Sequence, residues 1–119
     1  MSEVLAQLEK KGGGGDYADS YIVQSYGESS ANHSGSVYMP SEYFVPKFTQ
    51  VKYTLLSGSN LRSAKIRALS SIDQVLDTFT ISTSWQNIPS SFYQSNVQYV
   101  VLINDAKAYD SIRVRFEFR

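Results

Sequence analysis

The sequence predicts an all-β protein: an antiparallel β-sandwich of jelly-roll or immunoglobulin-like type, preceded by a short N-terminal helical arm on a glycine hinge. Apolar and polar residues alternate with a period of two through most of the chain, which is the pattern of strands buried on one face. Turn-forming residues interrupt this alternation roughly every 8–12 residues, as expected for about seven or eight short strands. With 119 residues, the chain has room for one domain.

The strongest strand signal lies near the C-terminus. From Ile112 to Phe118, four apolar residues alternate with charged ones, so we expect the apolar side chains in the core. Val97–Ile103 is apolar on both faces, which predicts a central strand. Trp85 is in phase with Phe79 and Ile81, and we expect it in the core. The other strands are expected at Tyr21–Tyr26, Ser36–Met39, Thr49–Leu55, Leu61–Leu69 and Thr78–Trp85.

Other stretches are predicted as turns or are ambiguous. Clusters of Asn, Asp, Ser and Gly predict turns at Asn32–Gly35, Ser57–Asn60 and Asn104–Lys107. Glu42–Val45 lies between two prolines, so it is either an edge strand or an irregular loop. Ser70–Leu76 combines a capping-box spacing with apolar residues at helical spacing, which predicts a turn of helix or a loop.

The N-terminal residues differ from the rest of the chain. Within Met1–Lys11, the residues Val4, Leu5 and Leu8 form a narrow apolar stripe of a short helix. A helix this short is marginal in water by itself, so it needs a surface on which to lie. Gly12–Gly15 then forms a flexible hinge, with an engineered linker as the alternative interpretation. The expected organisation is an anchoring arm at 1–11, a hinge at 12–15 and a sandwich domain at 16–119.

The composition narrows the classes of partner. The chain has no cysteine, which excludes disulfides, thiolate metal sites and a cysteine nucleophile. Its net charge is zero and no apolar run approaches the length of a membrane-spanning helix, so we expect neither a nucleic acid nor a membrane as partner. Lys65 with Arg67, and Arg113 with Arg115, would merge into a basic patch if their strands were adjacent. Outward charges on strands more often serve solubility.

The sequence contains no recognisable catalytic constellation. The single histidine, His33, lies in a predicted turn, and no set of carboxylates has metal-ligand spacing. Asn104, Asp105 and Asp110 could offer oxygens to Ca²⁺, but turn chemistry already accounts for the first two. No serine lies in a nucleophile motif. We therefore expect no enzymatic activity, no cofactor and no metal.

The aromatic residues suggest binding surfaces. The chain has 9 tyrosines, and tyrosine is favoured where one end of the ring is buried and the other reaches water. Tyr26, Tyr38, Tyr43 and Tyr93 lie in or near predicted loops, where they could stack on sugar rings or fill an interface. A half-buried position in the sheet is the alternative for each. Tyr38, Tyr43 and Tyr93 are the candidate ligand-stacking residues.

Two resemblances indicate functions. The stretch Phe79–Pro89 (FTISTSWQNIP) is similar to the strand–Trp–Gln segment of many jelly-roll carbohydrate-binding modules. The layout of a short arm, a glycine hinge and a cysteine-free sandwich rich in Ser, Thr and Tyr resembles small virion proteins of tailed bacteriophages. These are capsid-decorating, head-fibre or tail-attachment proteins, in which an N-terminal segment anchors and a β-domain projects.

The second resemblance implies a non-enzymatic structural protein of a virion, assembled in the host cytoplasm. It also implies a homo-oligomer that binds other virion proteins through Val4, Leu5 and Leu8. The alternative is a carbohydrate-binding or adhesin module of jelly-roll type that recognises surface glycans.

Overall fold

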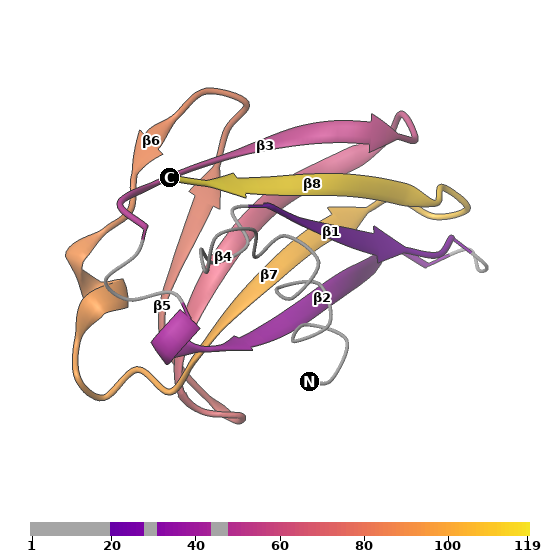
Figure 1. The fold of residues 1–119 in the computed structure, drawn as a ribbon. Helices are drawn as coiled ribbons and strands as arrows, with labels where there is room; N and C mark the ends of the chain where they lie inside the picture. Colours follow the sequence, from indigo (N-terminus) through magenta and orange to yellow (C-terminus); the bar gives the residue numbers. More distant parts are fainter. Residues whose placement is uncertain (1–19, 28–30, 44–47) are drawn as a thin grey trace.

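The computed structural model describes residues 20–27, 31–43 and 48–119, which fold into two facing β-sheets (Figure 1). Each sheet has four strands, and all strand pairs are antiparallel. Two short 3-10 helices, η2 (Ser41–Tyr43) and η3 (Ser90–Tyr93), lie between strands. The predicted class, an all-β antiparallel sandwich, is confirmed. The strands are β1 (Ser20–Ser25), β2 (His33–Pro40), β3 (Gln50–Ser57), β4 (Leu61–Ser71), β5 (Gln74–Ile81), β6 (Gln86–Asn87), β7 (Tyr99–Ala106) and β8 (Ile112–Phe118).

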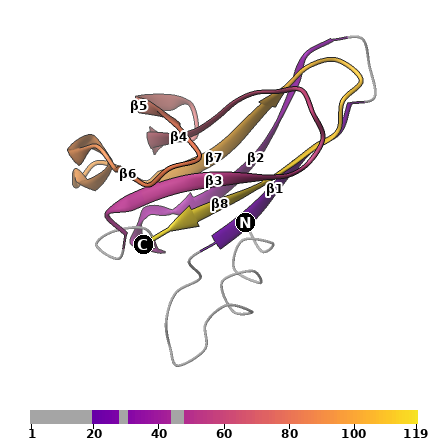
Figure 2. The ribbon, with the colours of Figure 1, turned by 90° about the horizontal axis from the view of Figure 1, so that it is seen from above.

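The strand order is β1-β8-β3-β6 in one sheet and β2-β7-β4-β5 in the other. Seen from above, the sheets form two layers, with β3, β8 and β1 in one and β4, β5 and β7 in the other (Figure 2). The first strand pairs with the eighth, the second with the seventh, the third with the sixth and the fourth with the fifth. The chain is therefore one long antiparallel ribbon, rolled up so that β8 also pairs with β3 and β7 with β4.

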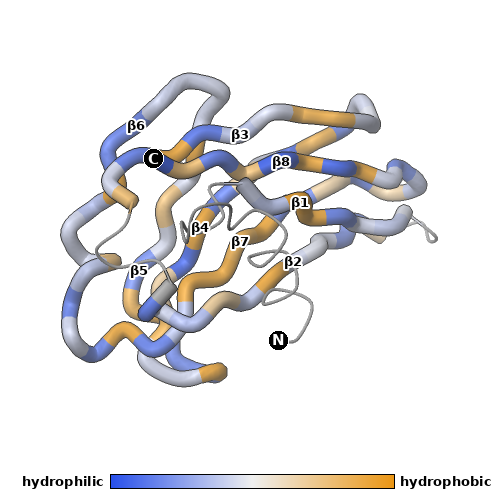
Figure 3. The backbone as a smooth tube through the Cα atoms, viewed as in Figure 1, coloured by the Kyte–Doolittle hydropathy of each residue, from blue (hydrophilic) through white to orange (hydrophobic). Residues whose placement is uncertain are grey.

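The core lies between the inward faces of the sheets, and β8 shows how the sequence builds it. The apolar residues of β8 are all buried, whereas the charged residues between them are half-buried or exposed. The same alternation is visible as orange and blue bands along the strands (Figure 3). Phe116, which is fully buried, lies in register between Tyr21 of β1 and Tyr53 of β3. The predicted orientation of this strand is confirmed.

β7 is the central strand that its apolar character on both faces predicts, but it begins later than expected, at Tyr99, and also ends later, at Ala106. The predicted turn at Asn104–Lys107 is wrong for the first three of its residues, which belong to β7. Asn104 is fully buried; its side-chain amide donates to the Val23 carbonyl oxygen at 2.8 Å, and its oxygen accepts from the Gly35 N–H at 3.3 Å. The first bond connects β7 to β1 in the opposite sheet and the second connects it to β2 in its own sheet. The amide therefore satisfies buried backbone groups instead of forming an Asx turn.

The β4–β5 hairpin corrects the expectation of a helical turn or loop at Ser70–Leu76. β4 continues to Ser71, β5 begins at Gln74, and these two residues are paired across the hairpin end. The pairing register shifts between Ala68 and Leu69 and again between Leu69 and Ser71. Each irregularity interrupts the period of two. Ile72 lies in the two-residue turn of the hairpin, and Leu76 is the extra residue between the paired Val75 and Asp77. The apolar residues therefore acquire a spacing that imitates a helix although Val75 and Leu76 belong to a strand.

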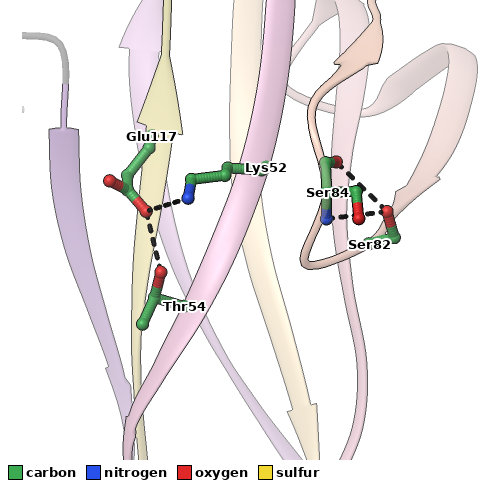
Figure 4. Close-up of polar contacts among 5 residues, drawn as sticks. All are labelled: Lys52, Thr54, Ser82, Ser84 and Glu117. Carbon is green, nitrogen blue, oxygen red and sulfur yellow. Dashed lines mark hydrogen bonds and ion pairs between the residues drawn. The ribbon is translucent and has the colours of Figure 1, made fainter.

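Trp85 is not in the core, contrary to expectation. β5 ends at Ile81, and the chain bends at Ser82–Ser84 before β6. The Ser82 hydroxyl donates to the Ser84 carbonyl oxygen and accepts from the Ser84 N–H, both at 3.2 Å (Figure 4). This bend breaks the alternation that places Phe79 and Ile81 inward. The alternation of apolar and polar residues does not reveal this bend, because a serine fits both the outward face of a strand and a bend.

The half-buried Trp85 ring lies instead on the outer side of the β1-β8-β3-β6 sheet, among cations. The Arg119 guanidinium is 4.2 Å from the ring centroid, and Lys52 Nζ is 5.5 Å from it. Lys52 also lies 3.8 Å from Glu117, which accepts a 2.8 Å hydrogen bond from Thr54 (Figure 4). Cation–π contacts of this kind stabilise an aromatic ring at the surface, although the ring is not packed in the core.

β2 differs from prediction at its beginning. The expected turn at Asn32–Gly35 is wrong from His33 onward, because β2 starts there. The glycine that suggested a turn, Gly35, is needed within the strand for another reason. A Cβ atom at this position would lie 2.1 Å from the Gln24 carbonyl oxygen, so β1 and β2 approach too closely for any side chain. The segment Glu42–Val45 is not a strand at its start, since Glu42 belongs to η2, and its last two residues lie outside the described residues.

The predicted arm Met1–Lys11, its apolar residues Val4, Leu5 and Leu8, and the hinge Gly12–Gly15 also lie outside the described residues. They remain predictions from the sequence. Within the described ranges, no helix has the length and apolar character needed to cross a bilayer.

Candidate functional site

The candidate site is a hollow of about 310 Å³ on the outer face of the β2-β7-β4-β5 sheet. Its floor consists of Leu69, Val101 and Ile103, which form a second apolar cluster separate from the main core. Val101 and Ile103 point outward because Val100 and Leu102, their neighbours along β7, belong to the main core. Ala68, which precedes Leu69 on β4, belongs to the main core as well. The apolar character of β7 on both faces therefore serves the core on one side and the hollow on the other.

An aromatic side chain forms one wall of the hollow. Tyr38, a predicted ligand-stacking residue, is half-buried on β2 opposite Val101 and lines the hollow. Tyr99 braces it edge-on, with ring centroids 6.5 Å apart and an interplanar angle of 75°. This edge-to-face geometry is favourable for two aromatic rings and fixes the orientation of Tyr38.

An ion pair also lines the hollow, further along β7, where Asp105 pairs with Ser34 of β2. Lys65 Nζ on β4 lies 2.8 Å from Asp105 Oδ2 on β7, and the Ser63 hydroxyl donates to the same oxygen at 2.8 Å. The Lys65 and Asp105 side chains retain 23% and 17% of their exposure, so both remain accessible to a ligand. Burial alone would raise the pKa of Asp105, but the hydrogen bonds from Lys65 and Ser63 and the lysine charge outweigh it and lower the pKa.

A guanidinium group provides further donors. Arg67, also on β4, donates through Nε to the Thr78 hydroxyl at 3.2 Å, and within the described residues no carboxylate pairs with it. Arg67 lines the hollow together with Lys65, Asp105 and Asp73. Two cations and two carboxylates therefore balance, and the hollow carries no net charge.

The β4–β5 hairpin forms the remaining rim, at the bottom of Figure 1. Ile72 and Val75 line the hollow and are 64% and 53% exposed. Leu76 beside them is also exposed. Exposed apolar residues gathered in this way are typical of contact surfaces.

The other predicted tyrosines are placed elsewhere. Tyr93, in η3, packs against the core and donates its hydroxyl to the Phe48 carbonyl oxygen at 2.6 Å; burial raises its pKa. Tyr26 follows β1 and is 67% exposed. Tyr43 is the last residue of η2, and its side chain is outside the description. The described structure therefore does not gather the three candidate stacking residues at one site; only Tyr38 lines the hollow.

The basic pairs and the proposed calcium oxygens are also separated. Lys65 and Arg67 are on β4, whereas Arg113 and Arg115 are on β8 in the opposite sheet, so they cannot form one patch. Asp110 accepts hydrogen bonds from the Ser59 and Asn60 N–H groups instead of joining Asp105. Within the described ranges, no three His, Asp or Glu side chains are placed to hold a metal ion.

The histidine stands at the start of β2. The ring nitrogens of His33 are both buried, and among the described residues neither has a hydrogen-bond partner.

Sequence reasoning named Tyr38 but missed the residues that surround it. The sequence pattern assigns Lys65 and Arg67 to solubility and Asp105 to turn formation, and it gives Leu69 only as the end of a strand. The signal that could have located the hollow is Val97–Ile103, because an apolar stripe facing away from the core requires cover by neighbouring side chains.

Comparison of the chain with protein-family models, with curated protein sequences and with solved structures gave no match.

Proposed function

We propose that this chain is a non-enzymatic structural protein of a virus particle, of jelly-roll type, that decorates a capsid or belongs to a head fibre or tail. The observation that carries the proposal is the pairing of strands first with eighth, second with seventh, third with sixth and fourth with fifth. A ribbon rolled in this way is the jelly roll, an architecture of viral capsid and lectin domains.

The immunoglobulin-like alternative fits less well. In that fold the first two strands are neighbours in one sheet. Here β1 and β2 belong to different sheets, and β4 with β5 is the only pair of consecutive strands that hydrogen-bond in the described part of the chain. The pairing thus favours the jelly roll of the two sandwich types that the sequence predicts.

The arm supplies the expected attachment. Val4, Leu5 and Leu8 form an apolar stripe that Gly12–Gly15 uncouples from the domain, so a partner surface can bury it. One such arm binds weakly because its ordering is costly, whereas several arms in a homo-oligomer bind together through their effective concentration. The partners in this proposal are other virion proteins, and the protein is located in the virion after assembly in the host cytoplasm.

The test uses gradient-purified particles of the virus whose genome encodes this chain. Mass spectrometry should detect the protein in the particle fraction, and sedimentation of the purified chain should give a homo-oligomer. Full-length protein with Leu5→Asp and Leu8→Asp should no longer add to particles that lack it. The control with Ala6→Asp and Gln7→Asp, which introduces the same two charges off the apolar stripe, should add normally. Absence of the protein from purified particles would overturn the proposal.

A carbohydrate-binding or adhesin module is the second candidate function. The hollow favours it, because an aromatic wall lies beside a set of polar groups that includes donors and acceptors. Sites for small ligands combine apolar lining with a few oriented polar groups in this way. Binding of the full chain to an array of immobilised glycans tests this candidate. If the chain binds none of the immobilised glycans, the carbohydrate-binding function is excluded.

A further inference from the structure

We propose that the hollow binds one uncharged pyranose ring, which stacks on Tyr38 and hydrogen-bonds to the Lys65–Asp105 pair and to Arg67. The inference rests on the second candidate function and names the ligand class and the residues that would recognise it.

The size and lining of the hollow limit the ligand. A volume of about 310 Å³ is at the lower end of the range for small-molecule sites, so it suits one ring better than an extended chain. The floor of Leu69, Val101 and Ile103 offers apolar contact, and the hairpin residues Ile72 and Val75 border the opposite side. A pyranose has C–H groups on its faces and hydroxyls around its edge. It can therefore contact the floor and Tyr38 while its hydroxyls reach the polar groups.

The ion pair matches two neighbouring hydroxyls. Lys65 Nζ is a donor without acceptor capacity, and an ionised Asp105 is an acceptor without donor capacity. These groups are 2.8 Å apart and partly exposed. One hydroxyl can donate to Asp105 while the adjacent hydroxyl accepts from Lys65. Hydrogen bonds to charged groups are stronger than neutral ones, so this pairing would supply orientation as well as affinity.

The charge balance selects against acidic ligands. Asp105 and Asp73 offset Lys65 and Arg67, so a carboxylate entering the hollow would meet no net positive charge. The Arg67 guanidinium retains donors beyond the one given to Thr78 and can serve a third sugar oxygen. A neutral, polyhydroxylated ring therefore fits these groups better than an anion.

The experiment titrates the full chain with the methyl α- and β-glycosides of glucose, galactose and mannose, followed by ¹H–¹⁵N NMR. Sodium glucuronate serves as the charged probe. Tyr38→Ala and Arg67→Gln are the test variants. Their controls are Tyr26→Ala, an exposed tyrosine beside the other sheet, and Arg113→Gln, an exposed arginine on β8. Thermal melts show which variants stay folded. Arg67→Gln decides if Tyr38→Ala does not fold, since within the described residues the Arg67 side chain hydrogen-bonds only to Thr78.

At least one neutral glycoside should shift the amide signals of Ser36, Tyr38, Lys65 and Arg67, and each test variant should weaken that binding about tenfold or more while the controls do not. Glycoside binding whose shifts lie elsewhere, or that survives both test variants, would overturn the proposed site and leave the carbohydrate function standing. Preference for glucuronate would overturn the neutral ligand. If neither these glycosides nor the glycan array binds, both the site and the carbohydrate function fail, while the virion proposal is untouched.

Discussion

Replacing Phe116 with alanine should cost more stability than any other single truncation on β8. The Phe116 side chain is fully buried in the main core. Its neighbour Arg115 faces the opposite side of the same strand and is half-buried there. The two substitutions therefore compare the two faces of one strand at adjacent positions.

The expected loss of unfolding free energy in Phe116→Ala depends on the burial of the side chain and on how little its surroundings can relax. Returning a fully buried aromatic side chain to water costs about 1.5–3 kcal/mol. Tyr21 and Tyr53 flank Phe116 in register, and the backbone pairing of β1 and β3 with β8 holds both in place, so the cavity cannot readily collapse. A cavity term is therefore added, and the total expected for Phe116→Ala is about 3–5 kcal/mol. Arg115→Ala should change the free energy of unfolding by less than about 0.5 kcal/mol.

Urea denaturation of the full chain, followed by far-UV circular dichroism, measures both values. Because a loss of this size is a large fraction of a typical domain's stability, Phe116→Leu provides a milder variant with a measurable transition. Its cost should lie between those of the other two. Equal costs for Phe116→Ala and Arg115→Ala, or a larger cost for the arginine, would refute the orientation of β8.

Two other perturbations test the contact between the sheets and the polar wall of the hollow. Gly35→Ala should destabilise the protein and shift the NMR signals of β1, because the added Cβ would lie 2.1 Å from a backbone oxygen of that strand; an unchanged melting temperature would contradict this close approach. The lowered pKa of Asp105 means that the folded state favours its ionised form, so its contribution to stability is present above 3.8 and is lost as the pH falls through the lowered value. Urea unfolding at neutral and at acidic pH should therefore show a smaller acid-induced loss for Asp105→Asn than for the unmodified chain, and equal losses would contradict the ion pair with Lys65.

The sequence predicts strands and the orientation of their side chains best where one face of the strand is buried and the other is exposed to solvent. β8 and the middle of β4 follow this rule, and in β4 the alternating residues Ala64, Ile66 and Ala68 are buried. β7 shows that an unbroken apolar run also identifies a central strand. In these strands the period of two is set by the pleat itself, so local sequence is sufficient.

Sequence reasoning fails where the backbone leaves that period or where a polar group is used inside. The bulges near Leu69 and the bend after Ile81 shift the phase, which misplaces the hairpin and Trp85. Asn104 resembles a turn residue, but its partners Val23 and Gly35 are 81 and 69 residues away in the chain. Contacts over such separations depend on the strand order, which no local pattern encodes.

The candidate site also depends on the strand order. Tyr38 is predictable as an amphipathic aromatic residue near a turn. Lys65 and Asp105 become neighbours only because β4 and β7 pair, and nothing in either segment indicates that pairing. A site whose residues come from strands that are distant in the sequence cannot be predicted until the order of the strands in the sheet is known.

Asp77 shows how one exposed strand edge is protected, and it provides the last prediction. β5 is an outer strand of its sheet and has neither lysine nor proline, the usual protection against strand addition. The Asp77 carboxylate accepts the Thr78 N–H at 2.8 Å and the Ser91 hydroxyl, so it occupies an edge amide and ties η3 beside it. Asp77→Ala should therefore increase association of the chain, measured by light scattering over time, more than Asp73→Ala, which removes an equal charge from the exposed hairpin end. Equal association of the two variants would mean that charge alone, and not the occupied amide, keeps this edge from pairing.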